Sequence, residues 1–315
     1  MERVSGSLTR PHPGAPPPSR TPLGPRRQSR LKRVGRFGAR HGLSVPAFGW
    51  TALFFIAPLV ILVVYSFGQI NFFTLQLHWG WTTENYSQIG QSLYRDAIAR
   101  SLGLSFAATG SCLVVGYPLA YWISRQPPRR QRLWLLVLII PFWSSFLVRT
   151  YAIGSLLANG GPLESALHTT GLLSGPLNVQ YSSLAVGIGI VYSYLPLMVL
   201  PLYVALERLD PLLDQSASDL GARPWRVFWR VRLPLSAPGI IAGCILVGIP
   251  ASGEYVIPTI LGGGKTLMYG NLVSTQFLEV GNFPFGSALA VTLMAGVTVF
   301  ALVARRFSRS AEEIT

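Results

Sequence analysis

The stretch SDLGARPWRVFWRVRLPLSAPG, Ser218–Gly239, decides how this chain is organised. It lies between two apolar runs that are each long enough to cross a membrane, and it combines four arginines with two tryptophans and three prolines. These charges exclude a membrane span, because burying arginine in lipid is costly. The regular spacing of its aromatic and basic residues favours ordered structure over an irregular loop.

Helix signals divide this region into two parts. Asp210 followed by Pro211 predicts a helix start, with a capping carboxylate and a proline at the first helical position. Gly221 is suited to end that helix, and Pro224 begins a second one with an aromatic stripe over Trp225–Trp229. The second helix could lie at the lipid headgroups or dock a partner protein. The glycine between the helices favours docking, since a surface helix needs no bend.

The rest of the chain contains six apolar runs of the length that a bilayer requires, which is about 20 residues per helix. Only helices or closed barrels satisfy their backbone groups in lipid. We therefore predict an all-α membrane protein. The predicted spans are Phe48–Phe67, Ser101–Ser124, Leu133–Leu157, Ser182–Ala205, Gly239–Leu261 and Ser287–Ala304.

The basic residues predict the orientation of these spans. A net charge of +14 suggests nucleic-acid binding at first, but the basic residues gather in short clusters between the apolar runs, as in membrane proteins. All but four of the 26 lie in the N-terminal tail, in the loops after the second and fourth spans, or at the C-terminus. The positive-inside rule therefore places both termini in the cytoplasm, with lipid and not nucleic acid as the surroundings. The four exceptions are Arg95, Arg100, Arg149 and Lys265.

Composition predicts three regions along the chain. Residues 1–45 hold seven prolines and ten basic residues but no apolar block, which predicts a disordered, basic cytoplasmic tail. Residues 46–306 form the membrane domain, with a cytoplasmic coupling loop at 207–238, and residues 307–315 form a cytoplasmic C-terminal tail. A secretory signal is not expected, because the first apolar run starts late and lacks a small-residue cleavage site.

The run QSASDLGARPWRVFWRVRLPLSAPGI, Gln215–Ile240, resembles the cytoplasmic signature loop of ABC importer permeases. That family's pattern is Glu-Ala-Ala, three residues, Gly, then a hydrophobic run to Leu-Pro-Leu and Pro-Gly. The family's glutamate is Gln215 here and its next alanine is Ser216, so the charge at this position is lost. The matching residues are Ala217, Leu220, Gly221, Ala222, Phe228, Leu233, Pro234, Leu235, Pro238 and Gly239.

In that family the loop forms coupling helices that sit in a cleft of the ATP-hydrolysing subunit. The resemblance therefore implies a six-span type I ABC importer permease fold with a cytoplasmic coupling-helix loop. Asp214 or Asp219 could supply the charge that Gln215 lacks. The implied ATPase-coupling residues are Gln215, Ala217, Asp219, Leu220, Gly221, Ala222, Trp225 and Phe228.

Three further runs extend the resemblance to permease subunits of spermidine/putrescine importers. They are IPFWSSFLVRTYA (Ile140–Ala152), YLPLMVLPLYVALERLD (Tyr194–Asp210) and GEYVIPTILGGGKTLMYGNLV (Gly253–Val273). The similarity covers roughly residues 48–304. It implies an ATP-driven polyamine importer of a bacterial inner membrane that works by alternating access. The implied partners are two ATPase subunits, a second, similar permease and an external substrate-binding protein.

The run LGGGKT, Leu261–Thr266, could be mistaken for a phosphate-binding loop. That motif needs a glycine five residues before Gly264, where this chain has Thr259. The predicted topology also places the run outside, where ATP is scarce. We therefore expect a non-catalytic subunit without a cofactor, with ATP and Mg²⁺ bound by a separate ATPase. The two cysteines lie in apolar runs and show no metal-binding spacing.

Glu254 is the one acid inside the predicted spans, and an ionisable group there is a functional hypothesis by default. Arg149 lies at the same predicted depth, about 23 Å from the cytoplasmic ends of straight spans. An ion pair between the two and a direct contact of Glu254 with substrate are equally supported. Trp143, Tyr192 and Tyr255 could stack on an ammonium group, although packing is the commoner role of such aromatics.

Three alternatives stay open. The same machine could carry another cargo, such as ferric iron or an organic anion. A stand-alone ion-coupled channel or carrier would need several acids or histidines within the spans, where this chain has Glu254 alone. A membrane-embedded enzyme would need clustered nucleophiles, bases or metal ligands in the predicted spans, and the sequence places none there.

Overall fold

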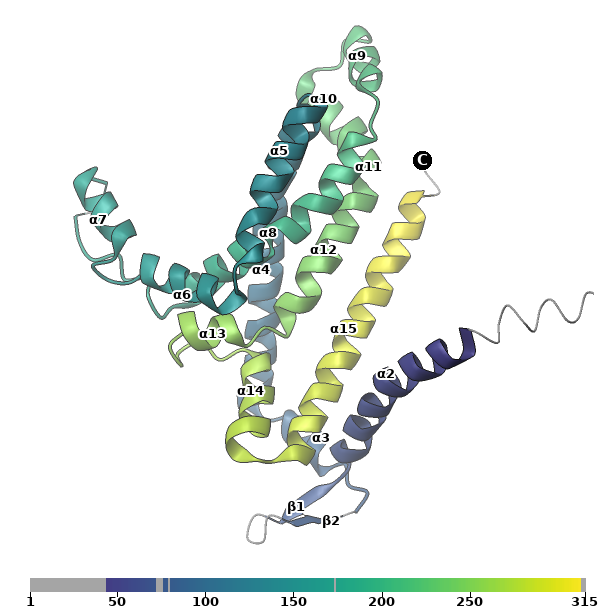
Figure 1. Ribbon diagram of the computed structural model, residues 1–315, viewed down its shortest axis with the longest axis vertical. Helices are drawn as coiled ribbons and strands as arrows, with labels where there is room; N and C mark the ends of the chain where they lie inside the picture. Colours follow the sequence, from purple (N-terminus) through teal and green to yellow (C-terminus); the bar gives the residue numbers. More distant parts are fainter. Residues whose placement is uncertain (1–43, 72–75, 79, 173, 313–315) are drawn as a thin grey trace, which may run out of the picture. The chain divides into compact units, whose positions relative to one another are not determined.

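The computed structural model describes residues 44–71, 76–78, 80–172 and 174–312. It divides the chain into two units, residues 1–57 and 58–315, which are described separately (Figure 1). The predicted disordered tail, residues 1–45, lies outside the described residues apart from its last two. Helix α2 (Ser44–Ser66) crosses the boundary between the units.

Helix α2 coincides with the first predicted span and is apolar on all sides. Its side chains Leu53, Phe54, Phe55 and Ile56 are all largely exposed. A run of exposed large apolar residues is unfavourable in water and suited to lipid or to a partner surface.

Three helices are long and apolar enough to cross a membrane unaided: α4 (Ser92–Ser124), α8 (Ser183–Glu207) and α15 (Phe283–Glu312). Helix α4 begins nine residues before the predicted span, because its first turns are polar and extend beyond the apolar run. Helix α15 likewise continues past its apolar part and ends at Glu312, within the predicted C-terminal tail.

Short elements connect these helices. Strands β1 (Gln69–Asn71) and β2 (Gln76–His78) form an antiparallel pair, so the fold is mostly helical, as predicted, with one small hairpin. The short helices are α3 (Glu84–Ile89), α7 (Pro162–Thr169), α9 (Pro211–Asp219), α10 (Pro224–Val227), η3 (Phe228–Arg232), α11 (Leu233–Leu235), α13 (Val256–Leu261), α14 (Tyr269–Thr275) and η4 (Gln276–Val280).

Two of the predicted spans are broken helices. Helix α5 (Pro128–Ile139) runs into a 3-10 turn, η2 (Ile140–Trp143), and meets α6 (Phe146–Leu156) at an angle of 93°. Ser144 and Ser145 at the break have extended backbone conformations. We had expected one continuous helix from Leu133 to Leu157, and the bend corrects that expectation.

The predicted span Gly239–Leu261 is broken between α12 (Ala237–Ser252) and α13. A further bend lies in the predicted cytoplasmic loop, where the segment Pro224–Leu235 meets α12 at 66°. Among the described residues, length and composition identify three spans, or five if each bent pair is one span. Helix α2, with its shorter apolar part Gly49–Tyr65, is the remaining candidate for the six predicted spans.

Helices α4, α8 and α12 lie side by side and form the main core of the second unit (Figure 1). Small residues let them approach closely: a Cβ added to Gly116 of α4 would lie 3.2 Å from Cγ of Met198 on α8. Gly243 of α12 faces the same methionine. The other buried residues of this cluster include Cys112, Ala120, Ile123, Val199, Leu202 and Val247.

Candidate functional site

The coupling loop begins with the predicted helix. The Asp210 side chain accepts a hydrogen bond from the backbone N–H of Leu212 at 2.9 Å, and Pro211 occupies the first helical position. Helix α9 ends at Asp219, and Gly221, just after the C-cap residue Leu220, has a φ of +79°, the left-handed conformation that glycine adopts freely. The N–H of Gly221 donates to the carbonyl of Ser218, and that of Ala222 to the carbonyl of Ala217. This is a Schellman-type helix end.

The second part of the loop has one buried and one exposed face. Val227 is buried, and the Phe228 ring packs edge-on against Tyr117 of α4, with centroids 5.6 Å apart. Trp225 and Trp229 pack on one another and stay largely exposed, so the predicted aromatic stripe is divided between the core and the surface. Leu220 is 89% exposed. A leucine and a tryptophan exposed on one short segment are typical of a docking surface.

The eight predicted coupling residues therefore fall into two groups. Ala217, Ala222 and Phe228 are half-buried and hold the loop together. The others are exposed and free to meet a partner: Gln215, Asp219, Leu220, Gly221 and Trp225.

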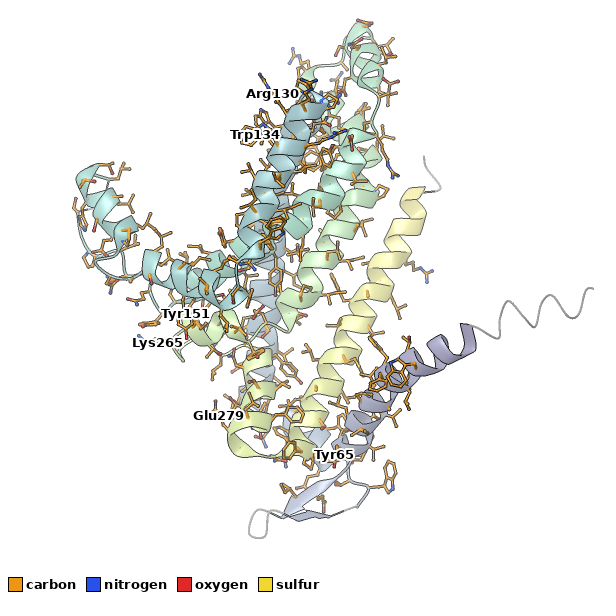
Figure 2. All side chains as sticks on the ribbon, in the orientation of Figure 1. Tyr65, Arg130, Trp134, Tyr151, Lys265 and Glu279 are labelled. Atoms are coloured by element: carbon orange, nitrogen blue, oxygen red, sulfur yellow. The ribbon has the colours of Figure 1, made fainter. Side chains whose placement is uncertain are left out.

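Asp214 joins the loop to the membrane helices. Its Oδ2 accepts from Nη2 of Arg125, at the end of α4, at 2.9 Å, and its Oδ1 accepts from Nε of Arg232 at 3.0 Å. Both guanidinium groups also lie over the ring of Tyr121, 5.2 and 4.6 Å from its centroid. We call these four residues the arginine clamp. Trp134, labelled on α5 in Figure 2, packs edge-on against Trp122 of α4.

Sequence reasoning missed the arginine clamp. It offered Asp214 as a possible charge toward an ATPase, whereas the carboxylate is already occupied within the chain. Burial lowers the pKa of Arg232, but the hydrogen bond and charge of Asp214 outweigh it, so the pKa lies above its usual value. The two arginines stand on either side of Asp214 in the sequence at separations of 89 and 18 residues, which form no recognisable pattern.

Glu254 occupies the break between α12 and α13 and is only 7% exposed. Its Oε1 accepts from the backbone N–H groups of Tyr255, Val256 and Ile257 at 2.9 to 3.3 Å. Its Oε2 accepts from the hydroxyl of Tyr194 at 2.5 Å. The carboxylate therefore caps the start of α13, a place that favours negative charge.

Arg149 lies on α6 and borders the same cavity as Glu254. This cavity has a volume of about 470 Å³ and is lined also by Ser193, Tyr194 and Tyr255. The guanidinium carbon lies 4.2 Å from the ring centroid of Phe142. Within the part of the chain that the structure describes, Arg149 and Glu254 form no ion pair.

The cavity thus unites three of the five predicted path residues, Arg149, Glu254 and Tyr255. Trp143 is 82% exposed and Tyr192 is also exposed, and neither lines this cavity. Tyr194 and Ser193 are additional lining residues that sequence reasoning did not select. A phenol within reach of a lone buried acid would have been the signal for Tyr194.

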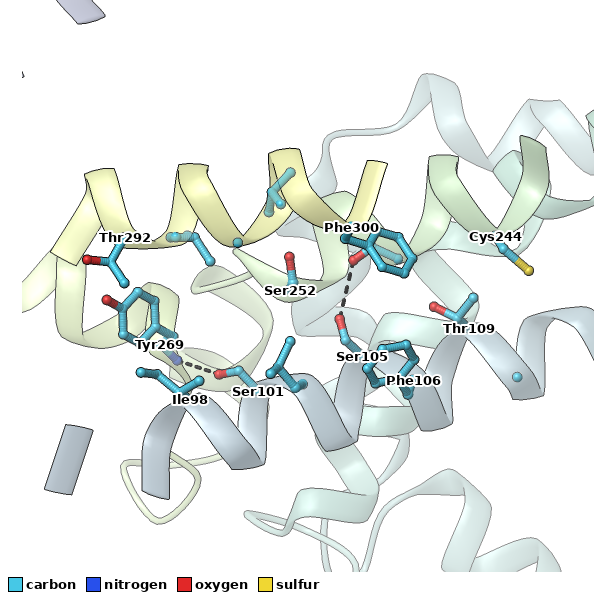
Figure 3. Close-up of a pocket in the computed structure, with 16 residues that line it drawn as sticks. Ile98, Ser101, Ser105, Phe106, Thr109, Cys244, Ser252, Tyr269, Thr292 and Phe300 are labelled. Atoms are coloured by element: carbon cyan, nitrogen blue, oxygen red, sulfur yellow. Dashed lines mark hydrogen bonds between the residues drawn. The ribbon is translucent and has the colours of Figure 1, made fainter. Parts of the chain in front are cut away.

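A second cavity, of about 520 Å³, lies between α4, α12 and α15 (Figure 3). Its walls are mostly apolar. Ser101 accepts a hydrogen bond from the backbone N–H of Tyr269 at 2.5 Å, and Ser105 donates to the carbonyl of Gly248 at 3.4 Å. These two hydroxyls thus tie neighbouring helices together, whereas those of Ser252 and Thr292 bond within their own helices. Across the described residues, no three metal-binding side chains come together in either cavity or elsewhere.

Comparison with known proteins gives a consistent result. Residues 113–313 match the family model described as "Binding-protein-dependent transport system inner membrane component". The "Spermidine/putrescine transport system permease protein PotB" of Haemophilus influenzae is 39% identical over 258 residues, covering 80% of this chain and 89% of that protein. The protein of the same name from Escherichia coli is 38% identical, covering 83% and 94%.

Similar solved structures agree on the fold. A bacterial ABC transporter involved in the import of the acidic polysaccharide alginate has a chain that superposes with a TM-score of 0.68. It is 18% identical and the match covers 89% of this chain and 98% of that one. A structure of a bacterial alginate ABC transporter with an alginate pentasaccharide-bound periplasmic protein gives a TM-score of 0.66 at 17% identity, covering 89% and 96%. At this identity the likeness supports the fold alone.

Proposed function

The chain belongs to the family of binding-protein-dependent transport system inner membrane components, and from that premise we propose that it forms half of the path of an ATP-driven polyamine importer. The assignment of polyamines as the cargo rests on the 37–39% identity to spermidine/putrescine permeases over at least 80% of the chain. The chain itself is a membrane permease subunit of an ABC importer.

ATP hydrolysis takes place on a separate subunit in this proposal. Two copies of an ATPase bind the cytoplasmic loops of this chain and of a second permease, and an external binding protein delivers the cargo. The exposed side chains of Leu220 and Trp225 support a docking role for the loop. This arrangement places both termini in the cytoplasm, in line with the positive-inside distribution of arginines.

Alternating access follows from how the loop is attached. When ATP closes the two ATPases, each docked loop is displaced with its ATPase. The arginine clamp transmits that displacement to α4, because Asp214 holds Arg125 at the end of α4 and Arg232 at the base of α12. The helices then rock and open the path outward, and hydrolysis returns it to the inward-facing state.

The cavity beside Glu254 supplies the cargo contacts in this proposal. Tyr255 is 45% exposed and offers a ring face to an ammonium group, a contact worth about 0.5–2 kcal/mol. The Glu254 carboxylate holds the local charge that a cation needs. Its hydrogen bonds to α13 and Tyr194 fix the position of that charge without removing it.

A specific observation favours a second candidate, an importer of an organic anion. Arg149 places an unpaired positive charge on the same cavity, and a guanidinium is the side chain best suited to bind a carboxylate. The two candidates predict opposite cargo charge.

The test uses the cognate external binding protein and the complete transporter. Calorimetry with spermidine, putrescine, ferric citrate and a dicarboxylate measures which cargo is bound, and proteoliposomes containing the full complex measure which is taken up with ATP. We expect binding and uptake of at least one polyamine. Binding of the dicarboxylate or of iron, with no polyamine bound, would replace our proposal by the corresponding cargo.

A further inference from the structure

Two side chains at the Glu254 cavity have polar atoms without a partner. Nε and Nη1 of Arg149 are buried and donate to nothing in the described part of the chain. Oγ of Ser193, in a residue only 3% exposed, is likewise unpaired. Both residues line the same cavity. A buried donor without an acceptor costs about 1–3 kcal/mol, and a charged one costs more.

The rings beside Arg149 do not meet this need. Phe142 and Phe146 lie 4.2 and 5.9 Å from the guanidinium carbon, and their faces attract its charge. A ring face cannot satisfy the five N–H donors of a guanidinium, which call for planar oxygen acceptors. Arg149 is thus held in place by aromatic contact while its hydrogen bonds remain open.

Glu254 cannot supply the acceptor without damage to its own surroundings. Its Oε1 receives three backbone N–H groups and its Oε2 receives the Tyr194 hydroxyl. Turning the carboxylate toward Arg149 would leave the first turn of α13 uncapped. The part of the chain that the structure describes therefore offers Arg149 no free carboxylate.

The surface around Arg149 indicates where that acceptor comes from. Leu147, Val148 and Tyr151, which flank it on α6, are all largely exposed, so the charge sits within an unpartnered apolar face. An arginine without a counter-charge on such a face is unfavourable in contact with lipid. It is better placed against a protein surface that supplies a carboxylate. A polyamine cannot take this role, because its ammonium groups repel a guanidinium.

We propose that Arg149, with Ser193 beside it, receives a side-chain carboxylate from the second permease subunit. This inference rests on the proposed function only in requiring two permeases along one path. Neutralising Arg149 in this way leaves Glu254 as the uncompensated charge of the cavity. The assembled path is then attractive to cations, whereas this chain alone presents one charge of each sign there.

The experiment compares Arg149→Met, Arg149→Lys and a matched control, Arg95→Met, in the complete complex of permeases, ATPase and binding protein. Arg95 is an exposed arginine of α4 whose side chain forms no hydrogen bond or ion pair with the described residues. Co-purification of the second permease in detergent and spermidine uptake in proteoliposomes are both measured. Arg149→Met should lower recovery of the second permease roughly 30-fold or more, as expected when one partner of a buried charge pair is lost. Arg149→Lys should lower it less, and Arg95→Met should have no effect.

A charge swap identifies the partner. Arg149→Glu is combined in turn with a lysine at each acidic position in the membrane spans of the second permease, and one combination should restore assembly. Full assembly and full uptake with Arg149→Met would overturn the proposal. So would normal assembly with loss of uptake of an anionic cargo alone, since the carboxylate would then belong to the cargo. If the wild-type complex carries no polyamine, the proposed cargo fails while the assembly result still decides the role of Arg149.

Discussion

The arginine clamp and the Glu254 cavity treat charge in opposite ways. At the clamp, one carboxylate, Asp214, holds two arginines that also share the ring of Tyr121. In the cavity, Arg149 pairs with no carboxylate among the described residues, and Glu254 is engaged by backbone N–H groups and a tyrosine. At the clamp both guanidinium groups have a carboxylate, although Nε of Arg125 has no partner in the described part of the chain. In our proposal, the part that moves as one piece has its charges paired within the chain, and the part shared between subunits leaves the charge of Arg149 to the neighbour.

The largest effect on transport is expected at Gly221, which lies between Asp214 and Arg232 of the clamp in the sequence. Gly221 has φ of +79° and its N–H donates to the carbonyl of Ser218. Proline there would impose a φ near −65° and remove the donor. Gly221→Pro should lower uptake at least about 100-fold, the size expected from a backbone defect of about 3 kcal/mol, while the complex still assembles in the membrane.

Gly171 provides the matched control for that change. It has φ of +72° and its N–H donates to the carbonyl of His168, far from the coupling loop in sequence. Gly171→Pro should strain its loop in the same way and spare coupling. Equal loss of uptake in both variants would show that backbone strain alone, and not the coupling loop, explains the first result.

The second largest effect tests the clamp itself. Asp214→Asn leaves Arg125 and Arg232 without a counter-charge, so displacement of the loop is no longer passed to α4. These side chains are 20–27% exposed. The free energy lost with the ion pairs should therefore lie between that of a surface pair and that of a buried pair. We expect about a tenfold drop in cargo moved per ATP hydrolysed, measured in proteoliposomes, as for about 1.4 kcal/mol.

Asp219→Asn is the matched neighbour. Asp219 is on the same helix and is exposed, and its carboxylate forms no hydrogen bond or ion pair with the described residues. Its replacement should change the ratio of transport to hydrolysis less than about threefold. If Asp219→Asn uncouples the complex and Asp214→Asn does not, the charge acts on the ATPase surface and the clamp is not the transmitting element.

These comparisons also show which features of the structure can be predicted from the sequence. The two helices of the loop were predictable because Asp210, Pro211 and Gly221 act on their own backbone within a few residues. The clamp depends on residues 89 positions apart, and no local pattern encodes such a pairing. Glycine and proline residues, Gly248, Pro250, Gly253 and Pro258, mark the break beside Glu254 in the sequence. Hydrophobic length predicted the apolar helices, yet it could not reveal the break at Ser144 and Ser145, which interrupts an otherwise apolar run.

Arg149 and Glu254 were expected to lie close together, and they do, but the assumption behind that expectation was wrong. We placed both at one depth by assuming straight spans, whereas α6 follows a 93° bend and Glu254 sits in a helix break. They nevertheless line one cavity. The direct ion pair is absent among the described contacts, because Glu254 caps α13.

A smaller effect is expected from Glu254→Gln. The amide oxygen can keep the bonds to α13 and the amide nitrogen can face Tyr194, so the fold should persist while the charge is lost. We expect roughly fivefold weaker spermidine uptake at low concentration, as for about 1 kcal/mol, with normal recovery of the complex. Tyr194→Phe, which keeps the charge, should have less effect. Lost assembly in Glu254→Gln would instead make capping its main role.

The smallest effect tests the departure from the family pattern. Gln215 is exposed on α9, next to an Asp214 whose two oxygens already face arginines. A new carboxylate at Gln215→Glu would remain in water, so it should change transport by less than about twofold, as for an exposed charge. Ala217→Glu is the contrasting change, since Ala217 is half-buried and its carbonyl accepts from Ala222 at the helix end. If Gln215→Glu markedly raised transport, the coupling surface would be working by charge, and the exposed leucine and tryptophan would not suffice to explain its attachment.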